Sequence, residues 1–124
     1  FIAGPSGTAV ATVVGRAQRE GRWWYYLDDG LYGSYNGQLY DHARYPIDVI
    51  GGKGPLHPSV LAGPTCDSID VVREDIPLPE LQIGDLVVGR MMGAYTACSA
   101  TDFNFIPRAK IVALNAQAGS RRAD

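Results

Sequence analysis

The stretch Gly63-Pro64-Thr65-Cys66-Asp67-Ser68-Ile69-Asp70 is the segment around which we expect the rest of the chain to be organised. It follows the apolar run 60–62 and places a thiol beside a carboxylate. Because a Gly-Pro pair restricts the backbone, Cys66 and Asp67 are expected on a fixed loop at the end of a strand. A thiol can move a proton and a carboxylate can hold an ammonium group. The alternative is a small buried cysteine beside a turn-forming aspartate.

Length and composition indicate one globular domain. Of the 124 residues, 46% are hydrophobic and 19% are charged, which suffices for a core without metal or disulfide bonds. The formal net charge is -2 and the isoelectric point is near 5.6. Without a basic patch, apart from 121–122 in a polar tail, neither a nucleic-acid nor a membrane partner is expected. We expect no signal peptide and no membrane span, which needs roughly 20 apolar residues, and therefore a cytoplasmic protein.

The cysteine and histidine spacing offers no metal site. Cys66 and Cys98 are far apart and form no C-x-x-C pair, so free thiols of an intracellular protein are expected, although a single disulfide stays open. His42 and His57 lack the close ligand spacing of a Cys/His site. Cys98 is predicted to be a small core residue.

Many short strands are predicted, because the chain contains 15 glycines and 8 prolines. Strand-like runs occupy 8–14, 23–27, 47–50, 69–72, 86–89 and 108–114, with a hairpin turn at 18–21. Residues 51–58 are interpreted as an exposed loop and 77–80 as an extended linker. No apolar stripe has helical period and length. The pattern favours a mostly β fold, a sandwich or a barrel.

Four stretches in a fixed order resemble one protein family. They are YYLDDGLYGSYN (25–36), LYDHA (39–43), GPTCD (63–67) and MGAYT (92–96), and residues 79–85 and 103–105 fit the same pattern. Together they resemble the C-terminal β domain of the pyridoxal-phosphate-dependent ornithine/lysine decarboxylases of the alanine-racemase fold type (group IV). The resemblance implies a modified Greek-key β-barrel or β-sandwich domain over 1–115, followed by a polar tail at 116–124.

The resemblance also implies a larger enzyme. In this family a (β/α)8 barrel carries the lysine that forms the Schiff base with pyridoxal 5'-phosphate, and the β domain is the part resembled here. We therefore expect the chain to be one half of a longer decarboxylase, inactive alone and partnered by an N-terminal barrel. Residues 1–5 resemble the segment just after a phosphate-binding Gly-Arg on that barrel. The family enzymes are homodimers with active sites shared across the interface.

Catalytic and substrate-binding roles carry over to matching positions. Cys66 matches the family's proton donor, and a thiol with a reference pKa of about 8.5 is mostly protonated at neutral pH. Asp67 and Asp41 match the carboxylates that hold the distal ammonium of the substrate, one from each subunit. Tyr40 precedes Asp41 in a segment that resembles the turn setting substrate length. A turn or cap aspartate is the alternative for Asp41.

The remaining family positions concern the cofactor and the wall of the site. Tyr95 matches a tyrosine that contacts the cofactor phosphate, with Gly93 allowing a close approach; the alternative is a half-buried sheet tyrosine. Tyr32 and Phe103 match aromatic residues that line the shared site, although a packing role fits them nearly as well. Others are interpreted structurally: Trp23 and Trp24 as core or interface residues, and Asp28, Asp29 and Asp85 as turn formers.

The function implied by the resemblance is a carbon–carbon lyase of polyamine biosynthesis. It converts ornithine, or lysine, to putrescine or cadaverine and CO2. Two alternatives remain: a catalytically silent homologue that binds regulatory partners, and an arginine or diaminopimelate decarboxylase, for which the Tyr40-Asp41 pair is less suited. Phe105-Ile106, where many eukaryotic relatives carry a glycine, and the short loop 51–54 resemble bacterial members.

Overall fold

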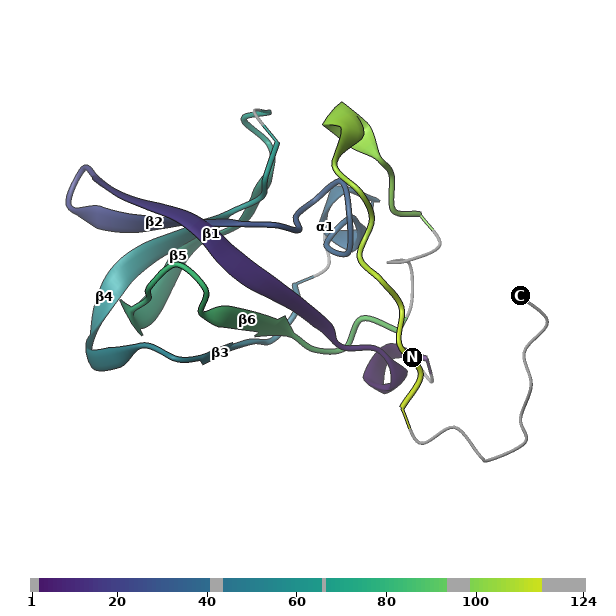
Figure 1. Ribbon diagram of the computed structural model, residues 1–124, viewed down its shortest axis with the longest axis horizontal. Coiled ribbons are helices and arrows are strands. Elements are labelled where there is room, and N and C mark those ends of the chain that lie inside the picture. Colours follow the sequence, from purple (N-terminus) through teal and green to yellow (C-terminus); the bar gives the residue numbers. More distant parts are fainter. Residues whose placement is uncertain (1–2, 41–43, 66, 94–98, 115–124) are drawn as a thin grey trace.

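The chain forms one curled sheet of six strands. The computed structural model describes residues 3–40, 44–65, 67–93 and 99–114. Its elements are η1 (Gly4–Ser6), β1 (Ala9–Arg19), β2 (Arg22–Leu27), α1 (Gly37–Tyr40), β3 (Ile47–Ile50), β4 (Lys53–Ala62), β5 (Val71–Glu80), β6 (Leu86–Gly89) and η2 (Phe103–Phe105). In the order β3-β6-β1-β2-β4-β5 the strands make a half-barrel (Figure 1). The mostly β prediction is confirmed, and the half-barrel is closer to its barrel form than to a sandwich.

One parallel pairing decides where the loops lie. The pairs β1–β2, β1–β6, β3–β6 and β4–β5 are antiparallel, whereas β2 and β4 run parallel. Parallel neighbours need a crossover rather than a tight turn. The crossover here comprises residues 28–52, and it contains α1 and β3. It therefore carries the Tyr32 and Tyr40 segments to the end of β4, where the loop 63–70 begins.

The predicted hairpin between β1 and β2 is confirmed. Arg19 pairs with Arg22, which leaves Glu20 and Gly21 as a two-residue turn. Both have positive φ, 53° and 77°, as the favoured hairpin turn of right-handed twist requires. The expected strands at 47–50 and 86–89 also form, as β3 and β6.

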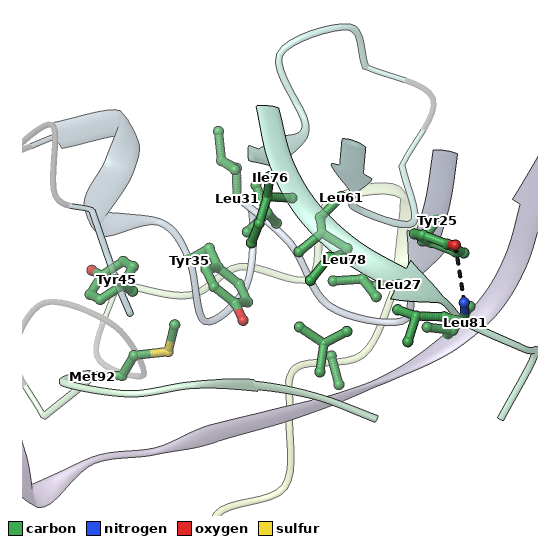
Figure 2. Close-up of a cluster of buried hydrophobic side chains, with 14 residues drawn as sticks. Tyr25, Leu27, Leu31, Tyr35, Tyr45, Leu61, Ile76, Leu78, Leu81 and Met92 are labelled. Atoms are coloured by element: carbon green, nitrogen blue, oxygen red, sulfur yellow. Dashed lines mark hydrogen bonds between the residues drawn. The ribbon is translucent and has the colours of Figure 1, made fainter. Parts of the chain in front are cut away.

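The core lies against one face of the curled sheet (Figure 2). It contains Tyr25, Leu27, Leu61, Leu81 and Val87, all fully buried. The hydroxyl of Tyr25 accepts a hydrogen bond from the Leu81 amide at 3.0 Å, so this buried polar atom is satisfied. Burial raises the pKa of Tyr25 above its ordinary value.

Two proline-rich predictions are wrong. Residues 51–58 were expected to be a loop and 77–80 a linker, but β4 begins at Lys53 and β5 continues to Glu80. The first half of β4 pairs only with β5, because β2 pairs with 59–62, and β5 itself is an edge strand. Prolines are tolerated where the missing N–H needs no partner. The edge positions therefore accommodate Pro55, Pro58, Pro77 and Pro79.

The predicted last strand at 108–114 is also wrong. These residues lie outside the six strands of the sheet, and the side chains of Ile111, Val112 and Leu114 are 74%, 66% and 82% exposed. Alternating character favours a strand only where a neighbouring strand is available. The strand expected at 69–72 begins later, at Val71, because the preceding residues belong to a turn.

Within the described ranges, no helix has the length and apolar character needed to cross a membrane. The predicted tail at 116–124 lies outside the described residues, and its boundary stays a prediction.

Leu27→Ala should destabilise the fold by about 2–5 kcal/mol, because it removes a fully buried side chain and leaves a cavity. Urea unfolding followed by fluorescence measures the change. Val14→Ala is the control, since Val14 is 51% exposed and should change stability by no more than about 0.5 kcal/mol. Equal effects of the two substitutions would contradict the assignment of the core.

Candidate active-site face

The loop 63–70 is closed by its own last residue. The Asp70 carboxylate accepts hydrogen bonds from the backbone amide of Thr65 at 3.0 Å and from its hydroxyl at 2.6 Å. The Asp70 amide donates to the Asp67 carbonyl, and the Gly63 amide donates to the Asp70 carbonyl. Thr65 and Asp67 are thus held at fixed positions on either side of residue 66.

Asp70 also ties this loop to the crossover. Its second carboxylate oxygen accepts the Leu31 amide at 2.9 Å, and the residue is only 2% exposed. Gly30 and Gly63 flank the carboxylate, and a Cβ on Gly30 would lie 2.7 Å from the Cα of Gly63. Side chains cannot enter such a contact without displacing one loop. A buried charge needs such hydrogen bonds, so the two loops have one mutual arrangement.

Tyr32 and Asp67 meet across the two loops. The Tyr32 hydroxyl donates to the Asp67 carboxylate at 2.7 Å, and the other carboxylate oxygen accepts the Ile69 amide at 3.1 Å. The hydrogen bond from Tyr32, followed by that from Ile69, lowers the pKa of Asp67 because both stabilise the ionised form. Asp67 is therefore an ionised, partly accessible carboxylate on this face.

Tyr32 also stacks on Phe103. The ring centroids are 4.2 Å apart and the planes are inclined by 19°. The Tyr32 carbonyl accepts hydrogen bonds from the amide and hydroxyl of Thr101, at 2.8 and 3.0 Å, which fixes the segment that carries Phe103. Thus the structure brings together three of the predicted site residues, Tyr32, Asp67 and Phe103, although they are far apart in sequence.

A pocket of about 280 Å³ lies beside the stacked pair, and Tyr32, Leu39 and Phe103 contribute to its lining. Leu39 belongs to α1, whose next residue is Tyr40. The Gln38 side chain donates to the Val72 carbonyl at 3.0 Å, which fastens α1 to β5. The turn predicted to set substrate length therefore begins at the edge of this pocket. In Figure 1, α1 and the segment around η2 lie close together on one side of the sheet.

Three predicted site residues, Asp41, Cys66 and Tyr95, lie outside the described residues. Their positions stay predictions, based on sequence and on the neighbours described above. Gly93, expected to allow close approach to the cofactor phosphate, contacts the N-terminal segment, and its role toward the cofactor stays a prediction. Its amide donates to the Gly4 carbonyl at 3.0 Å, and a Cβ there would lie 2.6 Å from the Ala3 carbonyl carbon.

Two aspartates of this face were not recognised from sequence as more than loop residues. The sequence assigns no role to Asp70 at the end of the stretch 63–70, and it predicts Asp29 as a turn former. Asp29 does form a turn, but it is also buried, with 8% exposure. A sequence signal exists for Asp29, since the following Gly30 and Gly33 leave room for its carboxylate. The glycines that flank the Asp70 carboxylate, Gly30 and Gly63, are brought to it by the fold.

Comparison with known proteins gives the family. The model of the C-terminal sheet domain of pyridoxal-dependent decarboxylases matches residues 1–93. The chain belongs to this family.

Individual relatives agree with that assignment. Lysine/ornithine decarboxylase from Selenomonas ruminantium is 45% identical over 104 residues, covering 84% of this chain and 26% of that protein. The crystal structure of lysine/ornithine decarboxylase from Vibrio vulnificus with cadaverine has a TM-score of 0.90 at 60% identity, covering 93% of this chain and 32% of that one. Antizyme inhibitor 2 from Xenopus laevis is 44% identical over 84 residues, covering 64% of this chain and 18% of that protein.

This decarboxylase sheet domain spans 26–28% of the length of the relatives that it matches first. The family depends on pyridoxal, and the described residues fit the cofactor's surroundings only in part. The ionised Asp67 beside the Tyr32–Phe103 pair suits an ammonium group and would repel a phosphate. This face therefore fits the substrate end of a site rather than the phosphate end.

Tyr32→Phe should raise the pKa of Asp67, because it removes the largest influence that lowers it. Carbon-13 NMR of the aspartate carboxyl groups during an acid titration measures the shift. With the lowered pKa, Asp67 favours the folded state above the ordinary aspartate pKa, and that contribution is lost as pH falls through the folded-state value. Tyr26→Phe is the control, since its hydroxyl contacts Arg19. An unchanged Asp67 titration in Tyr32→Phe would contradict the hydrogen bond.

Asp70→Ala should destabilise the fold by about 3 kcal/mol or more, because three donors of the two loops lose a buried charged acceptor. Thermal and urea unfolding measure the loss. Asp48→Ala is the matched control: its ion pair with Arg90 is exposed, with side chains 59% and 56% accessible, and should contribute less than about 1 kcal/mol. Similar losses in both variants would show that Asp70 does not join the loops.

Proposed function

We propose that this chain is the β domain of a homodimeric pyridoxal 5'-phosphate-dependent decarboxylase that converts ornithine or lysine to a diamine and CO2. The observation that carries the proposal is the ionised Asp67 held by Tyr32 beside an aromatic wall. The family membership supplies the reaction class, and the substrate class follows from the site and from the relatives.

The substrate's side-chain ammonium binds to Asp67. Charge-assisted hydrogen bonds favour an ammonium at an ionised carboxylate, and the Tyr32–Phe103 pair offers apolar surface for the methylenes between the two ends of a basic amino acid. Asp41, directly after Tyr40, supplies the second carboxylate. Two structures of the similar Vibrio vulnificus enzyme contain the diamines cadaverine and putrescine, which supports ornithine and lysine rather than arginine as substrates.

The proton comes from Cys66. When bound, the cofactor draws electrons from the substrate carbon that loses CO2. That carbon then needs one proton, and the Cys66 Sγ–H donates it, leaving a thiolate that solvent reprotonates. Residues on both sides of position 66 are fixed by Asp70, so the loop can hold the donor in place. Tyr95 holds the cofactor phosphate through its hydroxyl.

The other part of the site comes from outside this chain. The chain has two lysines, Lys53 and Lys110. Both are exposed, and neither lines the pocket beside Tyr32. As the family resemblance implies, we assign the lysine that holds the cofactor to an N-terminal barrel domain, with this face against the partner's barrel in the dimer. A thiol that donates protons must stay reduced, which suits the cytoplasm.

A regulatory binding role is not favoured. Binding alone requires neither a proton donor at Cys66 nor paired carboxylates at Asp41 and Asp67. Bound cofactor, seen by its absorbance in the complete protein, separates the two functions.

Cys66→Ala in the complete enzyme should lower diamine formation by about 100-fold or more, the usual contribution of a positioned proton donor. Chromatography of putrescine and cadaverine, with CO2 release measured in parallel, follows the reaction. Cys98→Ala is the matched control, because it removes a thiol that has no proposed step. Undiminished diamine output from Cys66→Ala would refute the assignment of the donor. A complete protein that neither binds the cofactor nor decarboxylates either amino acid would refute the function.

A further inference from the structure

Asp29 holds the turn that presents Tyr32. One oxygen of its carboxylate accepts the amides of Gly30 and Ser34, each at 2.9 Å, so the side chain spans the turn in which Tyr32 lies. The amides of Gly33 and Tyr35 both donate to the Gly30 carbonyl. The backbone on both sides of Tyr32 is therefore held by hydrogen bonds to the Asp29 carboxylate.

The same turn continues into α1. The Asn36 amide donates to Gly33, Gln38 to Tyr35 and Leu39 to Asn36, so hydrogen-bonded turns follow one another up to the helix. A displacement at Asp29 would thus reach both the Tyr32 hydroxyl and the start of the Tyr40 segment. Rigid support of this kind decides whether a binding group stays within reach of its ligand.

Asp29 destabilises the folded state more than a residue needed only for a turn would. It is 8% exposed, and its second oxygen, Oδ2, is buried without a hydrogen-bond partner among the described residues. A buried, incompletely bonded carboxylate opposes folding. Proteins retain buried polar atoms without hydrogen bonds mainly at sites where function requires them.

We propose that Asp29 is a positioning residue for the Tyr32–Asp67 pair and, through that pair, for the substrate ammonium. This inference rests on the proposed function for its substrate, but the contact that it concerns is within this chain. Asp29 fixes the turn that carries Tyr32, Tyr32 donates to Asp67, and this hydrogen bond orients the Asp67 carboxylate. Because Asp29 is only 8% exposed, the role assigned to it is exerted through Tyr32 and not by direct contact with the substrate.

The neighbouring Asp28 provides a matched control. Its carboxylate also accepts one backbone amide, that of Thr12 at 2.8 Å, but this bond joins the end of β2 to β1 rather than closing the Tyr32 turn. Asp28→Ala should therefore leave the substrate KM near that of the wild type.

The test measures KM and kcat of the complete enzyme with ornithine and lysine. Asp29→Ala should raise KM about tenfold or more and lower kcat less, because the ammonium loses its oriented partner. Asp29→Asn keeps an oxygen acceptor for the two amides and should restore KM to within about threefold. A KM unchanged in Asp29→Ala would overturn the proposal.

A double-mutant cycle isolates the coupling. If Asp29 acts through Tyr32, Asp29→Ala combined with Tyr32→Phe should raise KM no further than the larger single effect. Fully additive effects would show that Asp29 acts by another route and would overturn the inference.

A second readout is independent of activity. Asp29→Ala should raise the pKa of Asp67, measured by carboxyl NMR in the complete enzyme, in the same direction as Tyr32→Phe. If the wild type is inactive, the proposed function fails and this titration alone decides the positioning role.

If Asp29→Ala does not fold, Asp29→Asn and Asp29→Glu replace it. Asn should leave the pKa of Asp67 near its wild-type value, whereas Glu, with its acceptor displaced by one methylene, should raise it. Equal pKa values in those two variants would overturn the proposal.

Discussion

The buried carboxylate of Asp70 is the interaction on which the arrangement of the candidate site depends. Its hydrogen bonds to Leu31 and Thr65 join the loop that follows β2 to the loop that follows β4. These loops lie at the same edge of the sheet because β2 and β4 are parallel neighbours. A charge in the interior is stable only when donors surround it. The loops must therefore adopt the one register in which their donors converge on Asp70. This arrangement of the two loops fixes the relative positions of Tyr32, Asp67 and Phe103.

The sheet was predictable where local chemistry agrees with the fold. The β1–β2 hairpin could be predicted because a polar run ending in Gly21 separates two strand-like runs, whereas the positive φ of Glu20 is not a preference of glutamate. The prolines of β4 and β5 could not be placed in strands from the sequence, because their tolerance depends on which side of the strand has a neighbour. The failure at 108–114 has the same origin: its alternation is real, but the described sheet has no strand beside it.

The motifs predicted the residues of the candidate site. They did not predict the buried aspartates that hold those residues in position. The order of the stretches around Tyr32, Cys66 and Phe103 pointed to a shared face, and the structure brings Tyr32, Asp67 and Phe103 into contact. Asp29 stands directly before Gly30, a pair typical of an exposed turn, and Asp70, between Ile69 and Val71, has no local sequence sign of burial. Only the fold shows that both are buried and which amides they hold. The residues proposed to meet the substrate are thus easier to recognise in a sequence than those that hold them in place.

The central claim is that this face is one half of a site that another subunit's barrel completes. Subunit complementation tests it most directly. The complete enzyme with Asp67→Ala is mixed, under conditions of subunit exchange, with an enzyme in which the barrel lysine that holds the cofactor is replaced. Each variant alone should be nearly inactive. If the site is shared, random exchange should restore about a quarter of wild-type activity, since half of the dimers are mixed and each has one intact site. No recovery of activity on mixing, with subunit exchange demonstrated, would contradict the account.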